Sequence, residues 1–145
     1  VRKNLRDVDG QTALHAASKH GRVEIARQLL EAGADWNMQD AAGSTPLHVA
    51  TRVSKKEIAA LLLEAGADMD QRDDEGHTAL HIAVKHNHLD IAQLLLAAGA
   101  CRNRGDGDGS TPLHLVVGLN EVSATSLLLQ ARADINYQDV HGRTP

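Results

Sequence analysis

Aromatic residues make up only 1% of this 145-residue sequence. Trp36 and Tyr137 are the only two, and there is no Phe. A core without aromatic side chains must be filled by Leu, Ile, Val and Ala. Such a core suits thin, regularly spaced layers of helices better than one thick hydrophobic centre.

Cysteine and long apolar segments are scarce as well. Cys101 is the single cysteine, which excludes an intrachain disulfide and is most compatible with a reducing, cytoplasmic location. Apolar runs such as residues 58–63 are far shorter than the ~20 residues needed to cross a bilayer. No apolar segment follows the first residues, as a signal peptide would require. We therefore expect no direct membrane insertion.

Basic residues are in the minority, with 15 Lys and Arg against 19 Asp and Glu and a net charge of −4. A nucleic-acid-binding domain is usually net basic, so we expect no nucleic-acid partner. The sequence also has no phosphate-binding Gly-x-x-x-x-Gly-Lys motif and no nucleophile elbow around a serine.

One histidine-rich cluster is a candidate metal site, and it comprises His77, His81, His86 and His88. No cysteine or carboxylate completes a set of four ligands, and Thr78 stands where a metalloprotease helix has Glu. We therefore expect no metal site, no cofactor and no enzyme activity.

What the sequence does contain is a repeat of 33 residues. The octet Gly43-Ser-Thr-Pro-Leu-His-Val-Ala50 has counterparts that begin at Gly10, Gly76 and Gly109, and a further partial copy begins at Gly142. A fixed period of this length is typical of stacked arrays. The repeats span 9–41, 42–74, 75–107 and 108–140, so that residues 1–8 resemble the tail of a preceding repeat and residues 141–145 the start of a further one.

Each repeat predicts two helices and a polar connection. Thr45 is suited to cap a first helix, with Pro46 at its first position. Apolar residues at 58, 59, 62 and 63 predict one buried face of a second helix. Gly66 is suited to end that helix in the left-handed conformation, and the turn-forming segment 67–76 predicts a finger that leads to the next repeat.

These motifs resemble the ankyrin repeat. The resemblance rests on Thr-Pro-Leu-His-x-Ala at 45–50, on Leu-Leu-Glu-Ala-Gly-Ala-Asp at 29–35 and 62–68, and on Ala-Asp-Ile-Asn at 133–136, and it covers residues 9–141. It implies an all-α repeat solenoid of antiparallel helix pairs with β-hairpin or loop fingers. It also implies that the motif histidines bridge the motif threonines to neighbouring loop backbone.

The resemblance further implies a protein–protein interaction scaffold that binds a protein or peptide on its concave face, made of fingers and inner helices. We expect it to be a segment of a larger intracellular protein and a monomeric array. Positions that differ between copies are the expected contacts with that partner. On the fingers and inner helices they are Gln39, Ala41, Ala42, Ser44, Thr51, Arg52, Arg72, Asp74, Glu75, His77, Val84, Lys85, Asp108 and Ser110. Trp36 joins them as an exposed aromatic anchor, with a partly buried packing residue as the alternative.

The charges of this expected face are arranged by sign. The finger at residues 67–76, which is the third along the chain, is acidic at 73–75. Lys19, Arg52 and Lys85 form a basic row on the inner helices. Such a pattern could steer a partner that carries both signs of charge, and the alternative is ordinary solvated surface charge.

Two asparagines resemble targets of an asparaginyl hydroxylase. That enzyme's ankyrin substrates have Leu eight residues and Asp two residues before the modified Asn. Asn136 follows Leu128 and Asp134 in this way, and Asn37 follows Leu29 and Asp35.

The fourth repeat departs from the others. Arg132 replaces the glycine that ends the second helix, Val116 replaces a packing alanine, and Gly118 falls inside the first helix. A non-glycine residue in the left-handed conformation costs about 1 kcal/mol, so we expect this repeat to be the least stable.

Two other functions remain open. The array could regulate an enzyme or channel located elsewhere in a longer chain, or it could be an engineered ankyrin-type binder. Framework differences at Val53, Asn87, Leu119 and Ala124 favour a natural or naturally derived sequence.

Overall fold

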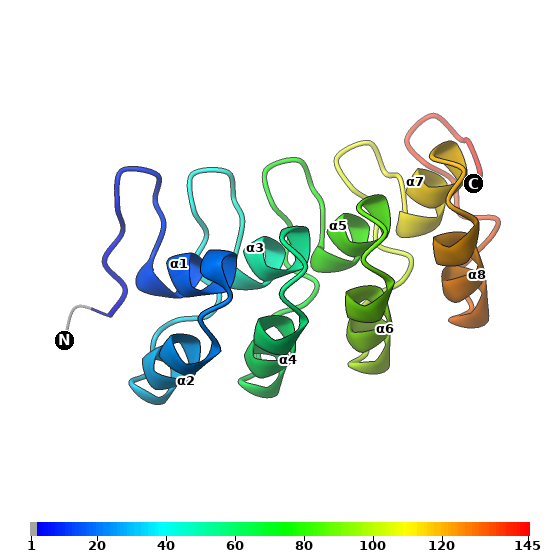
Figure 1. Ribbon diagram of the computed structural model, residues 1–145. Coiled ribbons are helices and arrows are strands. Elements are labelled where there is room, and N and C mark those ends of the chain that lie inside the picture. The colour runs from blue at the N-terminus through cyan, green and yellow to red at the C-terminus, as the bar shows by residue number, and fades with distance from the viewer. Residues whose placement is uncertain (1–2) are drawn as a thin grey trace.

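The computed structural model describes residues 3–145, in which eight helices form two parallel rows (Figure 1). The inner row comprises α1 (Ala13–His20), α3 (Pro46–Arg52), α5 (Ala79–Lys85) and α7 (Pro112–Gly118). The outer row comprises α2 (Val23–Glu31), α4 (Lys56–Glu64), α6 (Leu89–Ala97) and α8 (Val122–Gln130). Each inner helix packs against its own outer helix and against the inner helices beside it. The all-α repeat solenoid is thereby confirmed.

A threonine cap starts every inner helix. Thr45 accepts a hydrogen bond from the backbone N–H of His48, whose ring reaches back to the backbone N–H of Thr45. The same reciprocal capping box occurs at Thr12, Thr78 and Thr111. The predicted cap at Thr45 and the proline at the first helical position are therefore confirmed.

The core is one aliphatic ribbon that runs through all the repeats. Leucines of the inner helices, such as Leu47 and Leu80, are almost completely buried. From the outer helices, Ile58, Leu62 and Leu95 are buried against them. A single helix pair could not bury these side chains alone, so the repeats stabilise each other by stacking.

The fingers are loops, so the β-hairpin alternative is wrong: residues 3–145 contain no assigned strand. In the second finger, the backbone N–H of Asp40 donates to the carbonyl of Ser44 at 2.9 Å. The carboxylate of Asp40 also accepts from the N–H groups of Ala42 and Ser44, both at 2.9 Å. The aspartate side chain thus replaces the ladder of a hairpin by closing a compact turn.

The fourth repeat shows the expected departures in its backbone. Arg132 has φ of 61°, where Gly33, Gly66 and Gly99 occupy the same place in the other repeats with positive φ. Val116 is completely buried. Gly118 is the last residue of α7, so the expectation that it lies inside the helix is corrected to its end.

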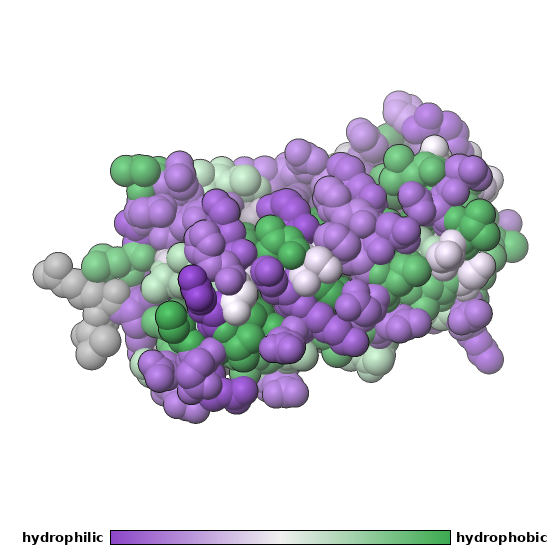
Figure 2. Space-filling view, in the orientation of Figure 1, coloured by the Kyte–Doolittle hydropathy of each residue, from purple (hydrophilic) through white to green (hydrophobic). Residues whose placement is uncertain are grey.

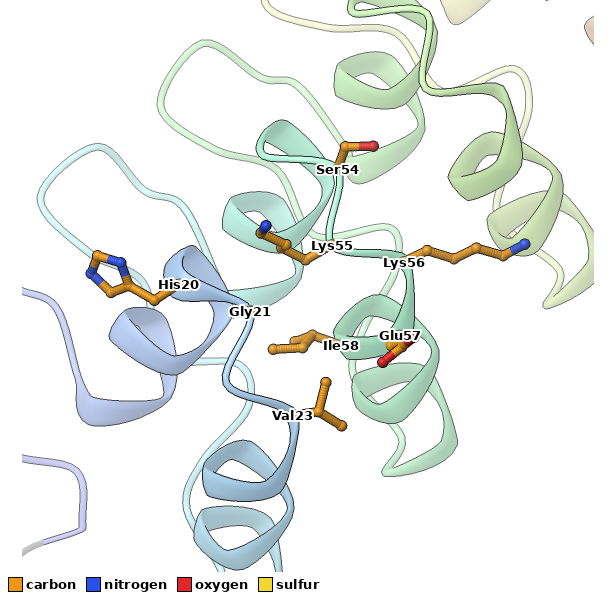
Figure 3. Close-up of a pocket in the computed structure, with 8 residues that line it drawn as sticks. All are labelled: His20, Gly21, Val23, Ser54, Lys55, Lys56, Glu57 and Ile58. Atoms are coloured by element: carbon orange, nitrogen blue, oxygen red, sulfur yellow. The ribbon is translucent and has the colours of Figure 1, made fainter.

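The turns between the inner and outer helices lie together on one side of the array, where the surface seen in Figure 2 is mainly hydrophilic with smaller apolar areas. Two neighbouring turns enclose a shallow pocket of about 340 Å³ lined by His20, Gly21, Lys55 and Lys56 among others (Figure 3). No helix within residues 3–145 has the length and apolar character needed to span a membrane.

Candidate functional site

The finger tips are joined into one continuous row by backbone hydrogen bonds. The N–H of Ala41 donates to the carbonyl of Asp9 at 3.0 Å, and the N–H of Asp74 donates to the carbonyl of Ala42 at 3.1 Å. The same bond links Gly107 to Glu75 and Val140 to Asp108, each at 3.1 Å. Each finger is therefore held by its neighbour, and the side chains at the tips project from a fixed backbone.

The motif histidines anchor this row to the helices. Nδ1 of His48 accepts from the backbone N–H of Thr45 at 3.1 Å, and its Nε2–H donates to the carbonyl of His77 in the next finger at 3.0 Å. His15, His81 and His114 reach Ser44, Ser110 and Arg143 in the same way. The bridging role that the ankyrin resemblance implied is present at all four positions.

These bridges need neutral imidazoles. Burial lowers the pKa of His15 and His48, and burial lowers the pKa of His81 to about 4, although the hydrogen bond to the Ser110 carbonyl acts in the opposite direction. The three rings are therefore uncharged near neutral pH. Their role is to position the fingers.

The predicted contact residues divide into three groups by exposure. The exposed ones are Ala41, Ala42, Arg52, Arg72, Asp74, Glu75, Lys85 and Asp108. We call these eight residues the finger face. Gln39, His77 and Ser110 are half-buried, and the side-chain amide of Gln39 bridges the carbonyls of Gly43 and Arg72 at 2.7 and 2.8 Å.

Ser44, Thr51 and Val84 are completely buried, so the expectation that their side chains are exposed to a partner is wrong. The signal was available in the spacing, because Thr51 and Val84 lie four residues after the core leucines Leu47 and Leu80 and therefore share their helix face. The exposed ends of the inner helices come one residue later, at Arg52 and Lys85. Val53 and His86, which follow these helices, are exposed as well, although the expected contacts did not include them.

Trp36 is half-buried and packs against the core. Its ring approaches Gly66, which follows the C-terminal end of α4, opposite the finger tips in Figure 1. The packing alternative is therefore correct for this residue, and we leave it out of the finger face.

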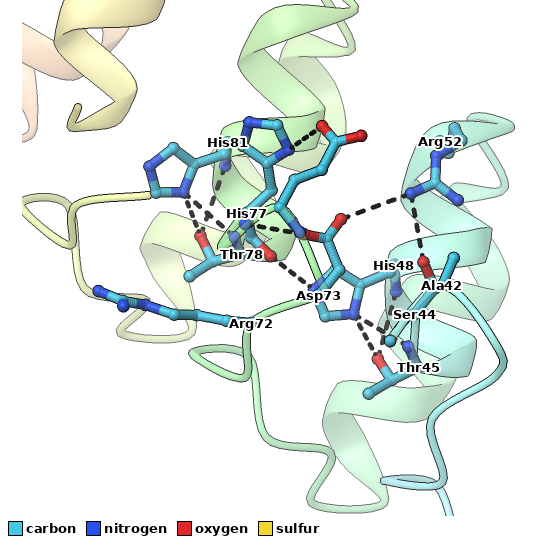
Figure 4. A network of polar contacts seen from close by, with 12 residues as sticks. Ala42, Ser44, Thr45, His48, Arg52, Arg72, Asp73, His77, Thr78 and His81 are labelled. Carbon is cyan, nitrogen blue, oxygen red and sulfur yellow. Dashed lines mark hydrogen bonds and ion pairs between the residues drawn. The ribbon is translucent and has the colours of Figure 1, made fainter. Parts of the chain in front are cut away.

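A charged network lies beside the finger face and spans two repeats, and part of it is drawn in Figure 4. Nη2 of Arg52 lies 3.8 Å from the carboxylate of Asp73 and donates to Oγ of Ser44 at 3.3 Å. The ring of His77 lies between Glu75 and Asp106, with nitrogen–oxygen distances of 3.3 and 3.7 Å. These contacts orient charged groups of both signs at the junction of the helices and fingers.

The two candidate hydroxylation sites differ in their surroundings. Oδ1 of Asn37 accepts from the backbone N–H of Asp68 at 3.0 Å, which links its repeat to the next one. Asn136 is exposed, and its own backbone N–H donates to the side chain of Asp134 at 2.9 Å. Modification at either asparagine stays a prediction.

The structure offers no group of three or more His, Cys, Asp or Glu side chains placed to hold a metal ion between residues 3 and 145. Comparison with known families gives one match: a model described as ankyrin repeats (3 copies) matches residues 1–73 and 47–139. A search of curated proteins finds no match.

Proposed function

Because this chain belongs to the ankyrin repeat family, whose members generally act as protein–protein interaction modules, we propose that it binds a partner protein or peptide on the finger face. The observation that carries the proposal is the contrast between framework and tips. Capping threonines and bridging histidines repeat in every copy, whereas the exposed side chains differ from finger to finger.

The fixed backbone of the fingers favours binding. Each tip is held by its own aspartate and by a hydrogen bond to the preceding finger. Few backbone degrees of freedom are left to be lost when a partner binds, so the entropic cost of association is reduced.

The chemistry of the tips indicates what they would accept. Ala41 and Ala42 make the second tip small and apolar. Asp74 and Glu75 on the third tip and Asp108 on the fourth are acidic and exposed. A complementary segment would place small or apolar groups against the second finger and basic groups against the third and fourth.

The proposal is tested by affinity capture from cell lysate with two charge-matched variants. Asp74→Lys/Glu75→Lys alters the finger face, and Glu31→Lys/Glu64→Lys makes the same change in charge on exposed ends of the outer helices. We expect a partner that is retained by wild type and by the outer-helix variant but lost by the finger variant. Circular dichroism confirms folding of each, and a partner retained equally by both variants would refute binding at the finger face.

We further propose that the array is a monomer located in the cytoplasm, and that it acts by binding a partner rather than by catalysis. The exposed free thiol of Cys101 supports a reducing compartment. Light scattering at increasing protein concentration tests the oligomeric state, and a mass that rises to that of a dimer would overturn it.

A further inference from the structure

The turns between inner and outer helices are basic, although the whole chain has a net charge of −4. Residues 19–22, 52–56 and 85–88 contain six of the fifteen Lys and Arg residues and no Asp or Glu. The remainder of the chain thus has nine basic residues against nineteen acidic ones. We call this surface the turn ridge and define it by Lys19, His20, Arg22, Arg52, Lys55, Lys56, Lys85, His86 and His88.

Stacking of the repeats brings these groups together. Successive inner helices pack side by side, so the turns that follow α1, α3 and α5 are neighbours (Figure 1). His20 and Lys55 lie on adjacent turns around the pocket described above, and Lys56 extends from the same surface (Figure 3). All six lysines and arginines of the ridge are exposed.

The protein itself neutralises little of this charge. Within residues 3–145, Arg52 is the only one of the six to form a salt bridge. Burial, together with the charges of His88, Lys85 and Arg52, lowers the pKa of His86. Protonation of His86 is therefore unfavourable beside these cations, and the electrostatic potential at the ridge is positive.

Helix stability accounts for some of the basic residues, because Lys19, Arg52 and Lys85 lie in the last turns of α1, α3 and α5, where the macrodipole favours cations. It does not account for the others. Lys55 and Lys56 occupy the N-cap and first position of α4, the end of a helix at which the macrodipole favours negative groups. Arg22 caps α2 in the same unfavourable way. Residues that weaken the local structure without a compensating contact point to a role in binding.

The ridge is narrow and has acidic borders. Glu24, Glu57 and Asp90 lie in the first turn of the outer helices, immediately after it. The fourth repeat has Gly118, Leu119, Asn120 and Glu121 at the corresponding turn, so the positive strip ends there. A wide anionic surface, such as a nucleic-acid duplex or a bilayer, would bring its phosphates close to these carboxylates, and their repulsion would weaken binding. A single extended chain is narrow enough to avoid this repulsion.

We propose that the turn ridge binds an acidic protein segment in an extended conformation, with a carboxylate or phosphorylated side chain at about every third residue. Adjacent helices pack about 8–10 Å apart. An extended chain in the polyproline II conformation has about three residues per turn and advances about 3.1 Å per residue, so every third side chain points to the same side and meets the next turn. The ridge shares Arg52 and Lys85 with the finger face, but its other residues lie outside that face. Variants at Lys55 and Lys56 therefore test the ridge independently of the proposed function.

The test uses fluorescence anisotropy with a labelled peptide that has Glu at every third position and Ser or Gly elsewhere. The matched control peptide has Gln in place of Glu. Lys55→Glu/Lys56→Glu reverses the centre of the ridge, whereas Arg27→Glu/Arg104→Glu makes the same change in charge at exposed positions outside it. Circular dichroism verifies that both variants are folded.

We expect the Glu peptide to bind wild type, the ridge variant to bind it about tenfold more weakly, and the control variant to bind it unchanged. Asp74→Lys/Glu75→Lys should not weaken binding, which separates this surface from the finger face. The bound peptide should also raise the pKa of His86, followed by NMR, because its negative charge relieves the repulsion from neighbouring cations.

Three results would overturn the proposal. Equal weakening in the ridge and control variants would mean that only overall charge matters. Equal binding of the Gln peptide would exclude recognition of acidic groups. Tighter binding of duplex DNA or of phosphatidylserine vesicles than of the peptide, lost in the ridge variant, would assign the ridge to nucleic acid or membrane instead.

Discussion

Replacing His81 by Gln should destabilise the array at neutral pH and make it less sensitive to acid. The ring is completely buried, and its Nδ1 accepts from the backbone N–H of Thr78 at 3.2 Å while Nε2–H donates to the Ser110 carbonyl at 3.0 Å. Protonation of Nδ1 would turn this acceptor into a donor that points at the N–H of Thr78, so the hydrogen bond between them would be lost. Loss of these bonds in His81→Gln should cost about 2–4 kcal/mol at pH 7.5, since buried backbone groups are left unpaired.

The acid response follows from the pKa of His81, which burial lowers from 6.5 to about 4. The unfolded chain takes up a proton as the pH falls below 6.5, whereas the folded chain does not until about pH 4. The stability associated with the neutral ring is therefore complete above pH 6.5 and is lost as the pH falls toward 4. Between pH 7.5 and 4.5 this loss amounts to about 2–3 kcal/mol for wild type, and the variant lacks it.

Urea unfolding followed by circular dichroism at several pH values measures the effect. The difference in free energy of unfolding between wild type and His81→Gln should shrink by about 2–3 kcal/mol from pH 7.5 to 4.5. His114→Gln is the matched control, because His114 makes the same bonds to Thr111 and Arg143 but is only half-buried, so its replacement should cost less. A difference between wild type and His81→Gln that stays constant across this pH range would refute the reasoning.

Four further predictions concern single residues. Arg132→Gly should raise the free energy of unfolding by about 1 kcal/mol in urea titrations, because it relieves the left-handed conformation at φ of 61°; an unchanged or lower value would show that the arginine is not strained. Thr51→Val should also stabilise by about 1 kcal/mol, since the buried Oγ1 of Thr51 has no hydrogen-bond partner within residues 3–145; destabilisation would contradict this. Trp36→Ala should lower the stability by about 1–3 kcal/mol without altering the partner captured, and loss of that partner from the folded variant would return Trp36 to the binding surface. Incubation with an asparaginyl hydroxylase should add the mass of one oxygen at the exposed Asn136, detected by mass spectrometry of peptides, and an unmodified peptide would remove the prediction.

Local features of the array were predictable because short segments encode them. The 33-residue period indicated stacking, and the spacing of Thr45, Pro46 and His48 indicated the cap of α3. A cap and the first turn of a helix involve residues three positions apart, so their geometry follows from neighbouring residues alone. The left-handed residue at Arg132 was predictable for the same reason, from the glycine at the equivalent place in the other repeats.

The candidate contacts were less predictable, because variation between repeats reports both exposure and packing. Thr51 and Val84 differ from their counterparts and are nevertheless buried, since each faces the stacked repeats rather than solvent. Trp36 is similar, because its packing beside Gly66 depends on how the next repeat is stacked. A contact across 30 residues of sequence leaves no local pattern that would distinguish a packed aromatic side chain from an exposed one.

By itself the sequence determined the repeat and the helix caps, because each depends on spacing within one copy, whereas the bridging histidines were expected from the ankyrin resemblance. Only the tertiary structure decided which variable side chains are exposed, how each finger bonds to the preceding one, and that the cations of three separate turns form one ridge. Those features arise from lateral stacking, in which residues 33 positions apart become neighbours. Their charges and hydrogen-bonding groups then act together, although nothing in a single repeat reveals it.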